Sequence, residues 1–220
     1  MIRRADNLDV YLLRHAEAYK NLAKVHGGGD QRLTPNGEQQ ARSVGSCLLR
    51  MRGGAEGLRI VHQPEGRSEA TARHVGIVAA RAILEVSDLV GVRLGVAGGL
   101  SEEELAARYP EVAASLIAWR TNKGDLGSRP RVPGSEPMEE FAERIHRGLV
   151  SSIEACGPDS SLAVVGTTST LNMMNHLLIN DGGFDRSSYD FIEFPLGSLA
   201  AWRISEGKPV QTMPITIPTL

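Results

Sequence analysis

The chain has 220 residues, 41% of them hydrophobic, and its 24 Lys and Arg residues nearly balance its 26 Asp and Glu residues, giving a formal net charge of -2. A chain of this length can bury one sizeable core, so we expect a single domain over residues 1–220. The balanced charge argues against a nucleic-acid-binding protein, the two cysteines argue against a disulfide framework, and the lack of an apolar run of ~20 residues argues against a membrane span.

The first predicted element is an apolar strand over residues 10–13. Before it, Asp6 and Asp9 interrupt what would be the apolar segment of a signal peptide, so we expect a cytoplasmic protein. Arg14 and His15 follow the strand directly. A neutral imidazole beside a guanidinium can attack a phosphoryl group that the guanidinium holds, which makes this pair the first candidate site.

Helices and strands alternate after this point. Thr34 can cap a helix that has Pro35 at its first position and runs to about Met51. A buried strand is expected over residues 58–61 and a second helix over 67–80. This alternation predicts an α/β fold with three layers, in which helices cover both faces of a mostly parallel sheet.

The second half of the chain is expected to contain four more helices and two more strands. Ser101 and Glu104 have the spacing of a capping box at the start of one helix. The tail contains three prolines and is not expected to form regular structure. In chain order the predictions are helices over 101–109, 112–119 and 138–156, a strand over 162–165, a turn over 166–169, a helix through Leu171, Met174 and Leu178, a strand over 198–204, and an irregular tail with Pro209, Pro214 and Pro218.

A lid or insertion is expected around residues 84–137. Its longest loop, between Trp119 and Pro137, is rich in Gly, Pro and Ser, and loops of that length are often functional. Basic residues give the loop a character suited to an anionic ligand, although a solvated loop can carry the same charges. These basic residues are Arg120, Lys123, Arg129 and Arg131.

Candidate site residues follow the strands of the predicted sheet, because ligands of such sheets bind beyond the carboxyl ends of the strands. No spacing of His, Asp and Glu indicates a metal site, and we expect no cofactor. The strand ends contribute Arg14, His15 and Asn21, then His62, Gln63 and Arg67, and finally Thr167 and Thr168.

Several sequence blocks at these positions resemble the histidine phosphatase superfamily, in the branch of the cofactor-dependent phosphoglycerate mutases and small-molecule phosphatases. Arg14-His15-Ala16-Glu17 with Asn21 is similar to the Arg-His-Gly-Glu opening of that family and its downstream Asn. The resemblance extends over most of the chain. The further matching positions are Asp30, Leu33-Thr34, Gly37 and Gln40-Ala41, then Pro64, Arg67, Thr71 and Ala72, and then Pro133-Gly134-Ser135-Glu136 with Phe141 and Arg144.

The resemblance implies a phosphoglycerate mutase-like fold and a role for each matching residue. His15 would take up the phosphoryl group, and Arg14 and Arg67 would hold its oxygens through charge-assisted hydrogen bonds. Asn21 would add a neutral donor. Two guanidinium groups would also lower the proportion of imidazolium, so that the ring nitrogen is free to attack.

The chain departs from the family pattern at two positions. Thr167 stands where active members carry a second His, and with Thr168 it can donate only neutral hydrogen bonds to a phosphate. Gly91 aligns with a Glu that gives its proton to the leaving oxygen in many members. General acid catalysis and oxyanion stabilisation contribute ~10²–10⁴-fold each, so hydrolysis of an alkyl phosphate is expected to be slow unless another residue compensates. The candidates for compensation are His62, Glu65 and Glu17.

Three functions remain open at this stage. The first is phosphoryl transfer through His15 on a small phosphorylated molecule, with an altered proton donor. The second is a catalytically degenerate protein that binds a phosphorylated ligand. The third is a pocket turned to non-hydrolytic biosynthetic chemistry, with His15 as base and the arginines holding a carboxylate. In each case the expected partner is a phosphorylated or otherwise anionic small molecule, with no nucleic acid and no membrane, and a homodimer is compatible with the sequence.

Overall fold

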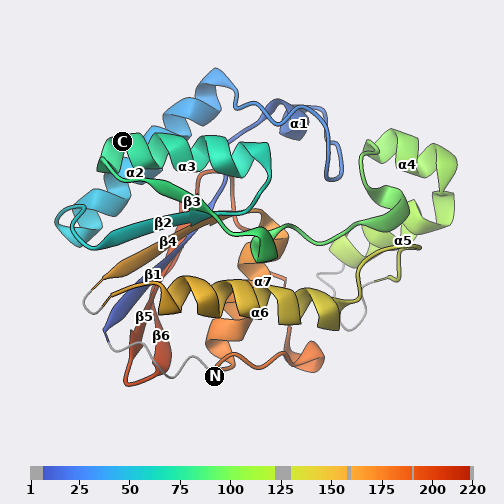
Figure 1. The fold of residues 1–220 in the computed structure, drawn as a ribbon. Helices are drawn as coiled ribbons and strands as arrows, with labels where there is room; N and C mark the ends of the chain where they lie inside the picture. The colour runs from blue at the N-terminus through green and yellow to red at the C-terminus, as the bar shows by residue number, and fades with distance from the viewer. Residues whose placement is uncertain (1–6, 122–129, 158–159, 190, 219–220) are drawn as a thin grey trace.

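The computed structural model describes residues 7–121, 130–157, 160–189 and 191–218. At its centre is a six-stranded sheet in the order β3-β2-β4-β1-β5-β6 (Figure 1). The strands from β3 to β1 pair in parallel, and β5 and β6 add two antiparallel pairings. The mostly parallel sheet predicted from the sequence is confirmed. The strands are β1 Leu8–Arg14, β2 Leu58–His62, β3 Ile83–Glu85, β4 Ser161–Gly166, β5 Leu199–Ser205 and β6 Lys208–Thr216.

Helices cover both faces of this sheet, as the three-layer prediction requires. On one face, α2 and α3 pack Val44, Leu48 and Val75 against apolar side chains of β1, β2 and β4. On the other face, α6 and α7 bury a larger cluster that includes Phe141 and Met174. The helices are α1 Tyr19–Leu22, α2 Pro35–Arg52, α3 Gly66–Ala79, α4 Glu102–Arg108, α5 Pro110–Thr121, α6 Met138–Glu154 and α7 Thr168–Ile179.

The predicted caps of two helices are confirmed. The hydroxyl of Thr34 accepts a hydrogen bond from the backbone N–H of Gly37 at 2.9 Å and so caps α2. Ser101 and Glu104 form the expected reciprocal capping box of α4. Gly37 has a second role, because a Cβ at this position would lie 2.0 Å from the carbonyl oxygen of Glu17. The start of α2 therefore packs directly against the loop that follows β1.

The prediction that the C-terminal tail is irregular is wrong. Residues 208–216 form β6, which pairs antiparallel with β5 at the edge of the sheet, although Pro209 and Pro214 lie within it. Proline lacks the N–H that a central strand needs, but an edge strand can leave that position unpaired. The register of the β5 and β6 pair also shifts between Leu199 and Trp202. The short edge strand β3 was not predicted either.

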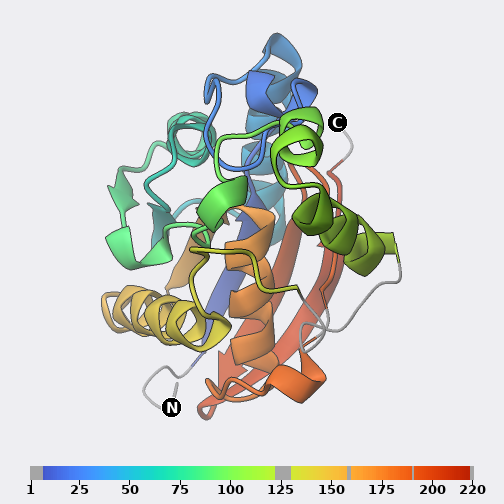
Figure 2. The same ribbon diagram turned by 90° about the vertical axis from the view of Figure 1, so that its right-hand side faces the viewer.

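Helices α4 and α5 lie to one side of the sheet, where Figure 1 shows them as a lobe, and Figure 2 views the molecule from that side. Their apolar side chains, together with Ala97 and Val132, form a small cluster of their own. The lid expected around 84–137 includes this lobe and stays a prediction. Of its basic residues, Arg131 is exposed, whereas Lys123, Arg129 and the side chain of Arg120 lie outside the described residues. None of the helices in the described ranges has the length and apolar character to cross a membrane.

Candidate functional site

His15 follows β1 at the carboxyl edge of the sheet, and its side chain is only 2% exposed. Its Nδ1 lies 2.8 Å from the carbonyl oxygen of Ala16, and its Nε2 accepts a hydrogen bond from Nε of Arg67 at 3.0 Å. A carbonyl oxygen cannot donate, so Nδ1 carries the proton and Nε2 keeps its lone pair. Arg67 lies in the first turn of α3, so the two residues come from distant parts of the chain.

The surroundings of His15 keep its imidazole uncharged. Burial lowers its pKa well below the usual 6.5, and the nearby positive charge of Arg67 lowers it further. The hydrogen bond to Ala16 acts in the opposite direction but is outweighed. A neutral ring with an unprotonated Nε2 is the form that can act as a nucleophile.

Three cationic side chains gather around this ring. Arg67 is 5% exposed and Lys20 is 8% exposed. Arg14 donates from Nη1 to the carbonyl oxygen of Phe194, while its buried Nε has no hydrogen-bond partner. Within the described parts of the chain, no carboxylate forms an ion pair with any of the three. Cations that are largely buried and form no ion pair favour the binding of an anion.

The sequence analysis did not predict Lys20 as part of this pocket. Burial, followed by the charges of Arg67 and Arg14, lowers its pKa from 10.5 to about 8, while the negative charge of Glu65 acts against this shift. The backbone N–H of Lys20 donates to the carbonyl oxygen of Asp30 at 2.9 Å, which folds α1 against the loop before α2. Its position one residue before Asn21 was the only signal in the sequence.

Gly91 and Thr167 lie together at the edge of this pocket. A Cβ at Gly91 would lie 2.9 Å from Oε1 of Glu65, 3.5 Å from Oγ1 of Thr167 and 3.9 Å from Oγ of Ser169. The Glu65 carboxylate already fills that space, because Oε1 accepts a hydrogen bond from the backbone N–H of Gly91 at 2.8 Å. The carboxylate of Glu65, at the start of α3, therefore lies beside Gly91, the position at which the family resemblance leads one to expect a Glu.

Gln63 holds both sides of this arrangement in place. Its side chain is fully buried, and Oε1 accepts a hydrogen bond from the backbone N–H of Thr167 at 2.7 Å. Its Nε2 donates to Oε2 of Glu65. Both carboxylate oxygens of Glu65 are thus held by donors, which fixes the direction of a turn side chain that would otherwise face water.

A buried ion pair fixes the backbone that leads to Gly91. Arg144 donates to Glu136 from Nε at 3.0 Å and from Nη2 at 2.7 Å, in a two-pronged pair. Its Nη1 donates to the carbonyl oxygens of Asp88 at 2.8 Å and Val90 at 2.7 Å. The block that resembles the family's Pro-Gly-Gly-Glu segment therefore positions Gly91 from α6.

Two other predicted residues make local contacts. Oδ1 of Asn21 accepts a hydrogen bond from the backbone N–H of Ala18 at 3.0 Å, at the start of α1. Oε1 of Glu17 accepts hydrogen bonds from Thr34 at 2.6 Å and Asn36 at 3.3 Å, beside the start of α2. The phosphate-binding role of Asn21 stays a prediction. Glu17 is engaged in holding the loop against α2, so it is a weaker candidate for proton transfer than Glu65.

His62 and Thr168 complete the predicted set. His62 ends β2, is 3% exposed, and places Nδ1 3.0 Å from the carbonyl oxygen of Gln63. No hydrogen bond described in the structure joins it to His15, Arg67 or Glu65. The hydroxyl of Thr168 at the start of α7 is buried without a hydrogen-bond partner, so it can donate to a ligand.

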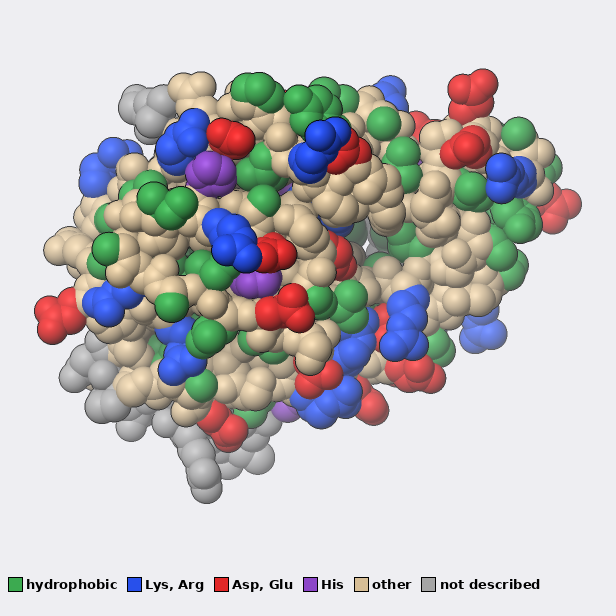
Figure 3. Space-filling model, turned by 45° about the horizontal axis from the view of Figure 1, so that its top comes forward, with side chains coloured by type: hydrophobic (Ala, Val, Ile, Leu, Met, Phe, Trp, Pro, Cys, Tyr) green, Lys and Arg blue, Asp and Glu red, His purple; other side chains and the backbone are tan. Residues whose placement is uncertain are grey.

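The charge on the surface is mixed, in contrast to the pocket. On the face that Figure 3 shows, Lys and Arg side chains are interspersed with Asp and Glu side chains. Within the described ranges, no group of three or more His, Cys, Asp or Glu side chains has the arrangement to hold a metal ion. Arg14, Lys20 and Arg67 thus form a small positively charged site around His15, which suits a small anion.

Comparisons with known proteins bear on the family and the fold of this chain. A family profile, the histidine phosphatase superfamily (branch 1), matches residues 10–213. The chain is 31% identical over 148 residues to the probable phosphoglycerate mutase GpmB of Salmonella paratyphi C, and the match covers 67% of this chain and 64% of the relative. The match thus spans slightly less than two thirds of the length of that curated relative.

Solved structures share the fold. The mycobacterial glucosyl-3-phosphoglycerate phosphatase Rv2419c superposes with a TM-score of 0.73 at 19% identity, covering 94% of this chain and 98% of that one. The α-ribazole phosphatase from Shigella flexneri superposes with a TM-score of 0.72 at 18% identity, covering 96% of each chain. At such low identity the likeness demonstrates the fold, while the chemistry depends on the residues present here.

Proposed function

The chain belongs to branch 1 of the histidine phosphatase superfamily, and from this membership we propose that it transfers the phosphoryl group of a small phosphorylated molecule to Nε2 of His15. The observation that carries the proposal is the unprotonated Nε2, which Arg67 approaches at 3.0 Å beside the further cations Arg14 and Lys20. Names of relatives such as phosphoglycerate mutase and phosphatase agree with this class of reaction.

The proposed reaction has two steps. In the first, Nε2 of His15 forms a bond to phosphorus, and the bond from phosphorus to the leaving oxygen breaks. In the second, a water oxygen attacks the phosphohistidine, the phosphorus–nitrogen bond breaks, and inorganic phosphate leaves. Arg14, Arg67 and Lys20 stabilise the negative charge on the phosphoryl oxygens in both steps, because they already surround His15 and two of them, Arg67 and Lys20, are shielded from water.

Lys20 supplies the charge that Thr167 lacks. The second His of active family members would contribute a charged donor, and Thr167 contributes a hydroxyl. The Lys20 ammonium lies close enough to Arg14 and Arg67 to influence their site electrostatically. In this proposal the pocket keeps three positive groups, with the third provided from α1.

Glu65 transfers the proton in this proposal, in place of the Glu that many family members carry at the position of Gly91. In the second step its carboxylate takes a proton from the attacking water, and in the next turnover it returns that proton to the leaving oxygen. Its support is the hydrogen bond from the backbone of Gly91 and the proximity of Oε1 to the place of a Gly91 side chain. No contact between His62 and Gly91 is described in the structure.

The proposal is tested by trapping the phosphoenzyme. We expect wild-type protein that is incubated with ³²P-labelled phosphoramidate, acetyl phosphate or an aryl phosphate to retain a label that is stable to alkali and labile to acid, as a phosphohistidine is. The absence of label from all three donors, together with measurable binding of inorganic phosphate, would favour the second function, a degenerate phospho-ligand-binding protein. Thr167 and Gly91 are the residues that motivate that alternative.

The role of Lys20 predicts a distinct pH dependence of anion binding. Sulfate favours the charged form of Lys20, whose pKa in the free protein is about 8, so we expect sulfate affinity to fall as the pH rises from 7 to 9. In Lys20→Met the affinity should be lower at pH 7 and almost constant over this range. Lys24→Met is the matched control, because Lys24 is exposed on the same segment and should behave as wild type. Calorimetric titration at three pH values measures this.

The lowered pKa of Lys20 also affects the stability of the protein, and a melting experiment on Lys20→Met shows at the same time whether that variant is folded. The unfolded chain binds a proton at Lys20 more tightly than the native chain does, so charged Lys20 destabilises the native state below pH 8. This penalty decreases as the pH rises from 8 towards 10.5. Lys20→Met should therefore melt at a higher temperature than wild type at pH 7. Equal sulfate affinity in the two proteins would contradict the assignment.

A further inference from the structure

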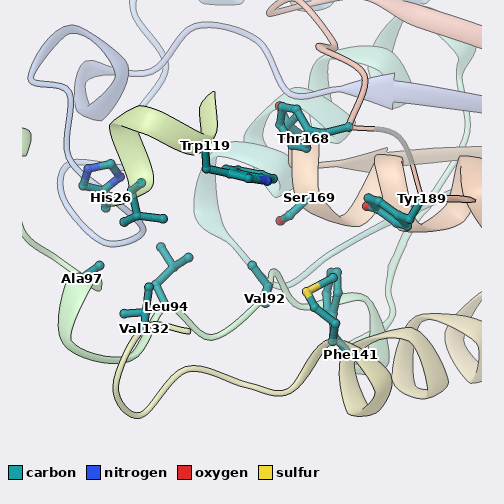
Figure 4. Close-up of a pocket in the computed structure, with 13 residues that line it drawn as sticks. His26, Val92, Leu94, Ala97, Trp119, Val132, Phe141, Thr168, Ser169 and Tyr189 are labelled. Carbon is teal, nitrogen blue, oxygen red and sulfur yellow. The ribbon is translucent and has the colours of Figure 1, made fainter. Parts of the chain in front are cut away.

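An apolar cavity of about 210 Å³ lies beside the anion pocket. Its walls come from α5, α6, the start of α7 and the segment after Gly91 (Figure 4). Phe141 and Tyr189 in these walls are almost fully buried. None of the described side chains that line it is Lys, Arg, Asp or Glu. The polar groups of the lining include those of His26, Thr168, Ser169 and Tyr189, so a second anionic group of a ligand would lose water there without meeting a lysine or an arginine.

The cavity and the anion pocket share a boundary. Ser169 lines the cavity, and its Oγ lies 3.2 Å from Oγ1 of Thr167. Val92 lines it as well and directly follows Gly91, whose N–H binds the Glu65 carboxylate. In Figure 4 the indole of Trp119 and the side chain of Val92 lie on opposite sides of the cavity, with Ser169 between them. The proposed proton-transfer group thus stands where the two spaces meet.

This arrangement determines where the organic part of a substrate goes. When the phosphorus atom is at Nε2 of His15, a leaving oxygen that exchanges a proton with Glu65 points towards Gly91 and Val92. The atoms attached to that oxygen then enter the cavity. Trp119 and Phe191 form an edge-to-face pair with ring centroids 5.6 Å apart at its wall, and such a wall favours a flat ring.

We propose that the substrate is a phosphomonoester whose leaving group is a compact apolar ring, held in this cavity, rather than a leaving group with a second anionic charge. The inference rests on the proposed function of His15. An engineered apolar cavity of roughly 150 Å³ binds benzene, so about 210 Å³ has room for one ring with small substituents. An aromatic alcohol is also a better leaving group than an alkyl alcohol, so its departure depends less on a general acid. This agrees with a site that has Gly91 in place of the family's acidic Glu.

The experiment compares three phosphonates on the wild-type protein, because their carbon–phosphorus bond is not cleaved by phosphoryl transfer. Methylphosphonate fills the anion pocket alone, benzylphosphonate adds one ring, and 2-carboxyethylphosphonate adds a second anion. By calorimetry we expect benzylphosphonate to bind at least tenfold more tightly than methylphosphonate, and the carboxyethyl compound to bind no more tightly. Equal affinity of the first two, or tighter binding of the carboxyethyl compound than of the benzyl one, would overturn the proposal.

Variants in α5 locate the effect. Trp119→Ala should reduce the preference for benzylphosphonate to about threefold or less and leave methylphosphonate binding unchanged. Ile117→Ala is the matched control, because Ile117 lies on the same helix, is 61% exposed and does not line the cavity. If Trp119→Ala weakened both ligands equally, the cavity would be the wrong place for the ring. The comparison on wild-type protein stands even where a variant fails to fold.

The outcome is separable from that of the phosphoenzyme experiment. A labelled phosphohistidine together with equal binding of benzyl and methyl compounds would overturn the cavity assignment and leave phosphoryl transfer in place. A clear preference for the benzyl compound without label from any donor would support the cavity as a binding site and reject transfer through His15.

Discussion

Replacing His15 by Ala is expected to abolish the phosphoenzyme. The variant lacks the imidazole whose Nε2 lone pair faces Arg67, so the acid-labile label should fall below detection and turnover should drop by on the order of 10³-fold or more. Acid and alkali treatment of the labelled proteins, with phosphate release measured in parallel, provides the readout.

The matched control is His62→Ala. His62 is equally buried, also lies at the carboxyl end of a strand, and also bonds to the carbonyl oxygen of the next residue, so the two variants remove similar side chains. The label should persist in His62→Ala. Its loss there, or its survival in His15→Ala, would mean that the nucleophile has been assigned wrongly.

The His15 variant should also differ from wild type in its acid stability. The native chain keeps His15 neutral, whereas the unfolded chain protonates it below about pH 6.5, so wild-type stability decreases as the pH falls through that value. His15→Ala has no such proton to gain on unfolding. Its free energy of unfolding should therefore depend less on pH between 7 and 5, which denaturant titration can measure.

Replacing Glu65 by Gln is expected to give the second largest effect. The amide keeps the size of the side chain but cannot accept a proton, so hydrolysis of the phosphohistidine should slow by ~10²–10⁴-fold. Formation of the phosphohistidine from an aryl phosphate should slow much less, because a phenolate leaves without full protonation. The labelled intermediate should consequently accumulate in Glu65→Gln above its wild-type level, which a single-turnover experiment detects.

Two further variants test this assignment. Glu69→Gln removes a carboxylate from the same turn of α3 that is paired with Arg73 on the surface, and it should leave turnover unchanged. A glutamate at position 91 would collide with the Glu65 carboxylate, because a Cβ there lies 2.9 Å from Oε1 of Glu65. The double variant Glu65→Ala with Gly91→Glu removes that collision and places a carboxylate at position 91, so part of the lost rate should return. Full activity of Glu65→Gln would show that another group moves the proton.

Much of this site follows from sequence because its parts come from the ends of regular elements. The strand before Arg14 and the helix that begins at Gly66 could both be predicted, and a parallel sheet brings their ends to one edge, which explains why Arg67 reaches His15. The predicted caps of α2 and α4 depend on local sequence alone, and they are confirmed.

The features that sequence analysis missed depend on contacts between distant segments. Lys20 is buried because the loop ending at Asp30 folds back over α1, and no local pattern encodes that return. The direction of Glu65 is determined by Gln63 and by the backbone of Gly91, and the latter is held in place from α6. Among the candidates for compensation, these contacts favour Glu65 over His62.

The two edges of the sheet limit how copies of this chain can associate. At one edge, Pro209 and Pro214 remove two backbone donors from β6, and at the other, β3 is a strand of three residues. Both features make a strand a poor template for pairing with another molecule. Pairing of a further strand is therefore disfavoured at both edges of the sheet. The same prolines that hid β6 in the sequence thus make its outer edge a poor site for edge-to-edge association.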